Sequence, residues 1–497
     1  MAEIGDQKLS RRDLLFGCGL AASAAFLPAG LAGVYGVGKY LEMLGEKALE
    51  PDFNYLNRMD LETPQSLCPD RLHLGQPSLP DKLRGVAGNF YNLWRWVDKD
   101  IELLAAIFRD GKGSPEELER LRASIQEKPL YRVLSGAKDL GFRRLRIYIN
   151  DAEAFRHRVP LRLESEIKNG YWFLEGFQDS VNPNNKDRYN FTVLDKIDCL
   201  FYLSKILGFD FDFEIELSDA FNLIHAPLFF SSNPDNEPSL TSPFLNLTLG
   251  VSHAQKVANF FTDNFAIDRF KKRITVISQH RGKYTGELFA SQPQIVAVSP
   301  MNEPNPFAID TGVTRKQARD WFTTIAKHTK NLFGDKILIF GYGQQGNINQ
   351  CIEDLGSIEE IDVFPFHFYF KAVNPLLFRS LAKSLRTPFE RSRKPLYLQE
   401  VNFGFSEVSE LPGFSHDQLT AIFLKQLFQA LCQDGRLLTN SIGCWGLAIP
   451  DPDNPERFDE NEELNKRDRH WIVPGMERTK DFLNFLDQLF IKIPVSC

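Results

Sequence analysis

The sequence has few of the features that mark metal-binding or disulfide-stapled proteins. Its 497 residues include only seven cysteines, and none of them forms a CxxC pair or stands at metal-ligand spacing. Neither a zinc centre nor a disulfide scaffold is therefore indicated, although the sequence does not exclude one or two disulfide bridges. We predict a protein that needs no metal and no cofactor.

A surplus of positive charge is also missing. The chain carries 58 Lys and Arg against 65 Asp and Glu, which gives a formal net charge of −7. Nucleic acids and anionic membrane surfaces attract proteins through clusters of Lys and Arg. The charge balance therefore argues against both as main partners, and no protein partner is evident from the sequence.

Long uncharged runs are confined to the N-terminus. Arg11 and Arg12 precede the run 14–38, which has no charged side chain, and the stretch SRRDLL at 10–15 resembles a twin-arginine export signal. The run is also long enough to span a bilayer, although Gly, Ala and Pro28 make it weakly hydrophobic. We predict export to the periplasm or the outside, with 1–38 as signal or anchor and 39–80 as an N-terminal extension. Any membrane contact would be made by this segment alone.

From residue 81 onward, short β-rich runs alternate with longer helical segments, as in parallel βαβ units. The fourth of these runs begins at Gln294 and ends in Asn302-Glu303-Pro304, and the other seven lie at 83–90, 143–149, 211–217, 336–343, 361–370, 394–404 and 441–450. The principal helices are expected at 114–142, 192–209, 253–284, 315–334, 416–435 and 477–492. Eight strands with intervening helices predict an α/β fold, a (β/α)8 TIM barrel over 81–497 with long βα loops.

Polar residues gather at the C-terminal tips of these strands, where barrel enzymes place their active sites. The set comprises Arg146, Asn302, Glu303, His367, Tyr369, Glu400 and Trp445. Glu303 on the fourth strand and Glu400 on the seventh would face each other across a closed barrel. Two carboxyl groups over an aromatic floor are what the cleavage of a glycosidic bond needs.

The same motifs resemble glycoside hydrolase family 5, the cellulase and β-mannanase family of clan A. The motifs MNEP at 301–304, LYLQE at 396–400, HFY at 367–369 and LGFRRLRIYI at 140–149 carry this resemblance. It implies Glu303 as acid/base and Glu400 as nucleophile. It also implies that Asn302 binds the sugar 2-hydroxyl, that Trp445 stacks under the sugar, and that Arg146, His367 and Tyr369 complete the substrate site.

The run 260–304 is especially similar to β-mannanases, which carry a comparable YTG element, here at 284–286. The resemblance therefore favours mannan among β-1,4-linked polysaccharides and oligosaccharides. Ser218 stands where many family members have a histidine, and Val298-Ser299 replaces the usual Trp-Glu before the motif. These departures leave open an endoglucanase or an exo-β-glycosidase on the same barrel. A catalytically silent carbohydrate-binding protein is the alternative from a different class.

A retaining mechanism sets conditions that a structure can test. The two carboxyl groups must lie about 5–5.5 Å apart, because one of them bonds to the sugar itself. Glu400 should be ionised, held by Arg146 and by a hydrogen bond from Tyr369. Glu303 should carry a proton before the first step.

Several other motifs have plainer interpretations. Asn236-Glu237-Pro238 repeats the tripeptide in a polar loop without a preceding strand, and GYGQQG at 341–346 fits a nucleotide fingerprint without the rest of its unit. His367 would alternatively be a core histidine, and Trp94 and Trp96 either line a sugar subsite or pack in the core. Ser415 is best explained as a helix cap.

Overall fold

The computed structural model describes most of the part of the chain that was predicted to form the barrel. The described residues are 73–74, 78–90, 93–149, 174–176, 188–189, 191–218, 253–307, 311–344, 348–370, 386, 388, 390–403, 415–433, 436–444 and 477–492. The predicted signal or anchor at 1–38 lies outside these residues, as do most of the extension at 39–80, the tripeptide at 236–238 and Trp445. For Tyr369 the backbone is described and the side chain is not.

The sheet closes into a barrel of eight parallel staves. Its hydrogen-bonded order is β8-β7-β6-β3-β2-β14-β11-β10-β9, and every neighbouring pair is parallel. The strands are β2 (Gly85–Phe90), β3 (Arg144–Tyr148), β6 (Asp212–Glu216), β7 (Ile295–Ser299), β8 (Ile337–Leu338), β9 (Gly343–Gln344), β10 (Phe364–Phe370), β11 (Leu396–Phe403) and β14 (Ser441–Cys444). Strands β8 and β9 belong to one continuous run of chain, so the two ends of the order are the same stave. A parallel bridge from Ile339 to Val363 joins that stave to the next. The predicted (β/α)8 barrel is confirmed.

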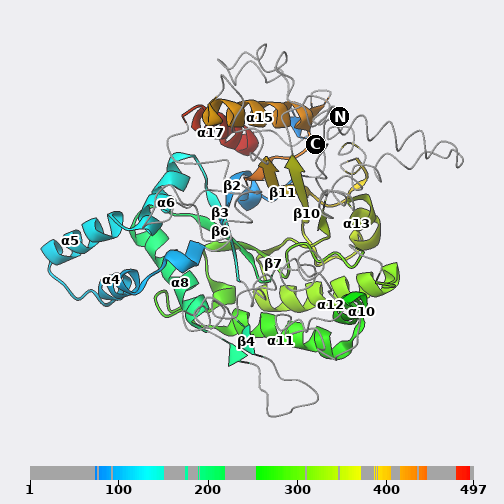
Figure 1. Cartoon of the computed structure of the whole chain (residues 1–497), viewed down its shortest axis with the longest axis horizontal. Coiled ribbons are helices and arrows are strands. Elements are labelled where there is room, and N and C mark those ends of the chain that lie inside the picture. The colour runs from blue at the N-terminus through cyan, green and yellow to red at the C-terminus, as the bar shows by residue number, and fades with distance from the viewer. Residues whose placement is uncertain are drawn as a thin grey trace, which may run out of the picture.

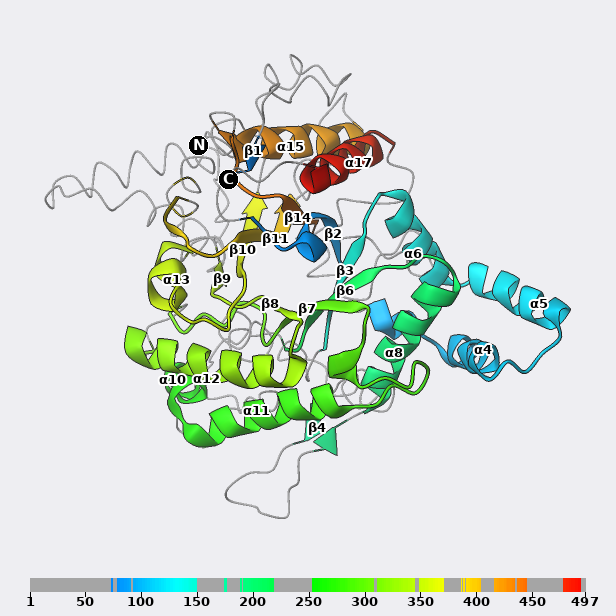
Figure 2. The same cartoon turned by 180° about the vertical axis from the view of Figure 1, so that it is seen from behind.

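Helices surround the barrel (Figures 1 and 2). They are α8 (Phe191–Ile206), α10 (His253–Thr262), α11 (Asn264–Gln279), α12 (Arg315–Phe333), α13 (Ile348–Leu355), α15 (His416–Leu431) and α17 (Glu477–Lys492). Both views place α15 beside α17 on one side and α10 to α12 on the opposite side. Capping boxes begin α12 at Thr314 and α15 at Ser415, so the predicted cap at Ser415 is confirmed.

Two predicted helices are wrong in extent. The expected helix 114–142 is divided into α5 (Pro115–Gln126) and α6 (Pro129–Asp139), because Pro129 lacks the N–H that a helix interior requires and starts a new helix instead. The expected helix 253–284 is divided between α10 and α11, where the Asp263 side chain caps the second helix by accepting from the Phe265 N–H.

Helix α4 (Lys99–Asp110) was not among the predicted helices. It lies with α5 and α6 between the first and second barrel strands. Helices α4 and α5 extend away from the barrel in both views (Figures 1 and 2). The signals for α4 were present in the sequence, since Asp98 caps it by accepting from the Ile101 N–H, and Ile101, Leu104 and Ala105 form its buried face.

Short elements complete the described structure. The 3-10 turns are η2 (Asp81–Leu83), η3 (Leu93–Trp96) and η6 (Phe289–Ser291), and the remaining strands are β1 (His73–Leu74), β4 (Leu174–Gly176), β5 (Arg188–Tyr189), β12 (Cys432–Gln433) and β13 (Arg436–Leu437). Strand β1 pairs with β13 in parallel, which ties the N-terminal extension to the barrel domain. Among the described helices, none has both the length and the apolar character needed to cross a bilayer.

The barrel interior changes character along its axis. At the N-terminal ends of the strands, Leu79 and Leu83 pack with Val296, Ala297, Ile339, Val363 and Tyr397 and close that end with an apolar plug. Above the plug the interior is charged, with Arg144, Arg146, Glu214 and Glu216 all buried. Barrels of this kind are commonly filled with branched apolar side chains, so these charges need a physical explanation.

Candidate active site

Glu303 follows β7 and Glu400 lies on β11, both at the mouth of the barrel, with the β8–β9 stave and β10 between them. Glu303 follows β7 in a left-handed backbone conformation, with φ of 48°. Such a conformation costs a non-glycine residue on the order of 1 kcal/mol and clusters at functional sites. Glu400 lies within β11, where the pairing with its neighbours shifts register, and its side chain is almost completely buried.

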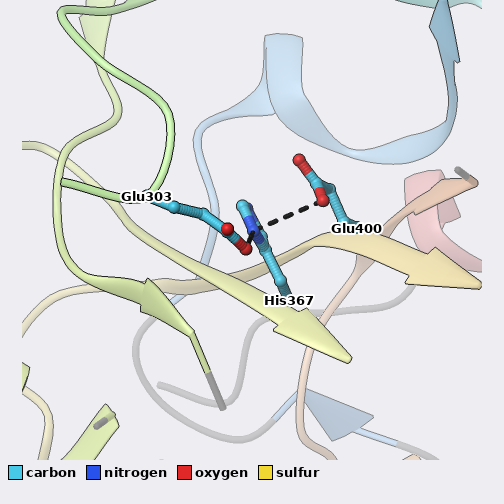
Figure 3. A group of neighbouring side chains, drawn as sticks. All are labelled: Glu303, His367 and Glu400. Carbon is cyan, nitrogen blue, oxygen red and sulfur yellow. Dashed lines mark hydrogen bonds and ion pairs between the residues drawn. The ribbon is translucent and has the colours of Figure 1, made fainter. Parts of the chain in front are cut away.

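His367 joins the two carboxyl groups (Figure 3). Its Nδ1 lies 2.7 Å from Oε1 of Glu303 and 3.4 Å from Oε2 of Glu400. One carboxyl oxygen of each glutamate and a ring nitrogen of His367 all lie within 4.8 Å of one another. This separation fits the retaining geometry of about 5–5.5 Å and is too short for the roughly 6.5–9.5 Å of inverting enzymes. The structure thus brings together the two glutamates that the sequence singled out.

The two glutamates differ in their access to solvent. The Glu303 side chain is 15% exposed, whereas that of Glu400 is 2% exposed. A group that exchanges protons with a leaving group and with water needs access, and an anion that attacks carbon benefits from a dry surrounding. The difference suits the two roles expected for these residues.

Two donors converge on one oxygen of Glu400. Arg146 Nη1 and the Tyr148 hydroxyl both donate to its Oε1, the hydroxyl at 2.9 Å. Donors to a carboxylate favour its ionised form, and they fix its orientation. Oε2 is the oxygen that lies toward His367 and Glu303.

The role of Tyr148 as a donor to Glu400 was not predicted from the sequence. The expected donor to Glu400 was Tyr369, whose side chain lies outside the described part of the chain. The signal that would have found Tyr148 is its position two residues after Arg146, because alternate residues of a strand lie on the same face. Both therefore point into the barrel from β3.

Asn302 and His367 are fixed by further hydrogen bonds. The Asn302 side-chain oxygen accepts from Arg146 Nη2 at 2.9 Å, which orients its amide beside Glu303. His367 Nε2 lies 2.9 Å from the Gln399 side-chain oxygen, so this nitrogen donates. Burial would lower the pKa of His367, but the Glu400 and Glu303 carboxyl groups outweigh burial and raise it. His367 is therefore part of the site and not a solitary core histidine.

The guanidinium of Arg146 is the centre of a buried network. Its Nε and Nη2 donate to Glu216 Oε1 at 2.8 and 2.6 Å, and its Nη1 donates to the Asn89 side-chain oxygen at 3.1 Å. Gln399 Nε2 also donates to Glu216 Oε1, at 3.0 Å, and to Glu214. Neither Glu214 nor Glu216 was predicted from the sequence to belong to the site.

The GYGQQG run is explained by close approach and not by a nucleotide. Gly343 has a φ of 74°, and a Cβ there would lie 3.1 Å from Cγ of Glu303 and 3.3 Å from Cε1 of His367. Only a glycine accepts both the backbone conformation and these neighbours without strain. The run thus makes room for the two side chains at the barrel mouth.

Two further sequence features have structural roles. Trp94 is fully buried and donates its indole N–H to the Tyr148 carbonyl oxygen at 2.9 Å, so it is a packing residue behind β3. Within the YTG element, the Tyr284 and Thr285 backbone N–H groups donate to the Asp198 carboxylate at 2.6 and 3.2 Å. That element ties the segment after α11 to α8.

Glu303, His367 and Glu400 also have the spacing of a metal-ligand set. The positive Arg146 guanidinium already binds Glu400, and a metal cation beside it would meet electrostatic repulsion. The arrangement fits a pair of reactive carboxyl groups better than a metal centre.

Comparisons with known proteins were made by sequence and by structure. Neither a scan against protein-family models nor a search of curated proteins gave a match. The fold is similar to the endo-β-1,4-mannanase of Thermotoga petrophila, at 14% identity and a TM-score of 0.50, over 82% of this chain and 77% of that one. It is also similar to a glycoside hydrolase family 5 mannosidase of Rhizomucor miehei, at 13% identity and a TM-score of 0.50, over 84% of this chain and 95% of that one. A mutant of the latter in complex with mannosyl-fructose gives a TM-score of 0.52 at 13% identity.

These likenesses are likenesses of fold. The described part of the chain has the (β/α)8-barrel fold of solved family 5 glycoside hydrolases, and it carries two glutamates facing each other at the mouth of that barrel.

Proposed function

We propose that this protein is a retaining β-glycoside hydrolase of family 5. The observation that supports this most is the carboxyl pair, with oxygens of Glu303 and Glu400 within 4.8 Å of each other at the C-terminal end of a (β/α)8 barrel. Proximity alone is common among acidic residues. Here one member is buried against Arg146 and Tyr148 and the other is partly exposed, so the two environments favour different roles.

The first half of the reaction uses both glutamates. Oε2 of Glu400 attacks the anomeric carbon, and Glu303 donates its proton to the departing glycosidic oxygen. The bond from carbon to the leaving group breaks as the ester to Glu400 forms. Asn302, oriented by Arg146, would bind the sugar 2-hydroxyl more tightly as the ring flattens, which stabilises the transition state over the ground state.

The second half reverses these roles. Glu303, now a carboxylate, takes a proton from water, and the water oxygen attacks the anomeric carbon. Glu400 leaves as a carboxylate and again accepts hydrogen bonds from Arg146 and Tyr148. His367 lies against both glutamates and would keep their separation constant through the cycle.

For the substrate, we propose a β-1,4-linked polysaccharide or oligosaccharide, with mannan favoured. The mannanase-like run at 260–304 supports this choice, together with the fold shared with a mannanase and a mannosidase. An endoglucanase or an exo-β-glycosidase on the same barrel is the alternative. We further propose that the twin-arginine-like segment directs export of the chain from the cytoplasm, so that it would encounter polysaccharide substrates outside.

The test is hydrolysis itself. Purified protein would be incubated with mannan, glucan and xylan, and reducing ends would be measured over time. We expect release from mannan first, with retention of anomeric configuration in the initial product by NMR. Binding of these polymers without hydrolysis would favour the silent carbohydrate-binding protein, and an inverted first product would contradict the roles given to the two glutamates.

A further inference from the structure

Of the charged layer beneath Glu400, Arg146 contacts the proposed nucleophile, and Arg144, Glu214 and Glu216 lie buried behind it. Arg144 and Arg146 point inward from β3, and Glu214 and Glu216 point inward from β6. All four side chains are within 2% of complete burial. Ionised groups at such depth are costly, so they persist where they hold one another in place or serve the site above.

Glu216 is the closest carboxylate neighbour of Arg146 apart from Glu400. Its Oε1 accepts from Nε and Nη2 of Arg146 at 2.8 and 2.6 Å, while Glu214 Oε1 lies 3.3 Å from Nε. The guanidinium therefore lies among three carboxyl groups, with Glu400 on Nη1, Glu216 on Nε and Nη2, and Glu214 farther from Nε. A planar guanidinium held on both sides keeps one orientation.

The charge on Glu400 does not last through the reaction. When its oxygen bonds to the anomeric carbon, the carboxylate becomes a neutral ester, and the leaving group departs with the proton from Glu303. Arg146 then remains as a buried cation that has lost one of its anions. A buried charge without a counterion is strongly destabilised.

We propose that Glu216 is a positioning residue, the second counterion of Arg146, which holds that guanidinium in place and balances its charge while Glu400 carries the sugar. This inference rests on the proposed retaining function. It explains why charged residues, and not branched apolar ones, fill the layer of the barrel directly beneath the nucleophile.

The surroundings of Glu216 allow it to respond to that change. It faces Arg146 from β3, Glu214 from its own strand, Ser299 from β7 and Gln399 from β11. Burial raises the pKa of Glu216 to about 7, with Arg146 opposing the rise and Glu214 adding to it. When Glu400 loses its negative charge, the positive charge of Arg146 is no longer shared with that carboxylate. Arg146 then stabilises the ionised form of Glu216 more strongly.

The experiment separates the two halves of the reaction. An activated 2-deoxy-2-fluoro mannoside would be reacted with the full-length wild-type protein and with Glu216→Gln, and the rates of covalent labelling and of later reactivation in buffer would be measured. Because the variant lacks the nearest remaining counterion of Arg146 in the esterified state, we expect labelling to slow by about tenfold, as for loss of one hydrogen bond to a charged group. Reactivation should become faster, because it restores the Glu400 carboxylate to Arg146.

Two further variants keep the result specific. Glu216→Asp retains the charge and should bring reactivation back toward the wild-type rate. Glu214→Gln removes a carboxyl group from the same face of the same strand, two residues before Glu216, and it should not reproduce the opposed change in the two rates. Circular dichroism and Tm would verify that each variant is folded.

A fall of both rates in Glu216→Gln, or a change in neither, would overturn the inference, since a purely structural residue moves both steps together. The same opposed pattern in Glu214→Gln would overturn the assignment to Glu216. Failure of the wild-type protein to be labelled at all would instead refute the proposed function.

Discussion

Tyr148 offers a sharp test of the site because it donates one hydrogen bond to the proposed nucleophile. Its hydroxyl lies 2.9 Å from Oε1 of Glu400, and the residue is fully buried on β3. Tyr148→Phe removes that donor and leaves the ring in place. A hydrogen bond to a charged group contributes roughly 1.5–3 kcal/mol, which corresponds to about one to two pH units in the protonation of the carboxylate.

The sign follows from the protonation state that the bond favours. A donor stabilises the ionised carboxylate, so its loss makes Glu400 easier to protonate. The acid limb of kcat/KM against pH should therefore move to higher pH by about one to two units. The assay is hydrolysis of manno-oligosaccharides between about pH 3 and 9.

Tyr397→Phe is the matched control. Tyr397 is equally buried in the barrel interior, but its hydroxyl accepts from Arg144 Nη2 at 3.0 Å, below the layer of Glu400. Its loss should leave the acid limb unchanged. The reasoning fails if Tyr148→Phe keeps the wild-type acid limb, or if both variants move it equally.

Three further predictions concern the same residues. Glu303→Gln should lower kcat by several orders of magnitude on polysaccharide but much less on an aryl glycoside, whose activated leaving group needs no proton. Glu400→Gln should lower kcat equally on both substrates. An equal loss of kcat on the two substrates in Glu303→Gln would contradict its role as the acid. Gly343→Ala should lower the unfolding free energy by about 1–2 kcal/mol and should also lower kcat. The control is Gly334→Ala, at a φ of 56° with no neighbour near its Cβ, which should lower the unfolding free energy and leave kcat unchanged. Chemical denaturation and steady-state kinetics measure the two effects. Because the pKa of Glu216 is about 7 in the folded protein against an ordinary 4.5, its stabilising contribution is present below pH 4.5 and is lost as pH rises through 7. As pH rises from 4.5 to 7, the unfolding free energy of Glu216→Gln should therefore increase by about 3 kcal/mol relative to that of the wild type. A difference in unfolding free energy between variant and wild type that stays constant with pH would contradict this.

The sequence predicted the barrel, and the placement of Glu303 and Glu400 at its mouth, because the signals for both are local. Each strand is a short apolar run, and the tip of the fourth carries Asn302 and Glu303 where an apolar run stops. The position of Arg146 followed from the same pattern. The breaks at Pro129 and Asp263 were also visible as residue types, but the long helical pattern around each was given more weight.

The charged interior was not predictable in the same way. In FDFEIEL at 211–217 the acidic residues alternate with apolar ones, and this pattern ordinarily indicates a strand with one face in water. In the closed barrel that second face is the interior, and Glu214 and Glu216 meet Arg144 and Arg146 there. Such pairing joins residues about 70 positions apart, so it depends on the register between β3 and β6 and leaves no local pattern. The predicted signal, the export route and the stacking role of Trp445 stay predictions.

The central claim is that Glu400 becomes covalently bound to the sugar, opposite Glu303. Reaction with an activated 2-deoxy-2-fluoro mannoside, followed by mass spectrometry of the intact protein and of its peptides, tests this directly. The account predicts one added glycosyl mass, located on Glu400, and none in Glu400→Gln. A label on Glu303 or on another residue, from a protein that hydrolyses the same glycoside, would contradict it.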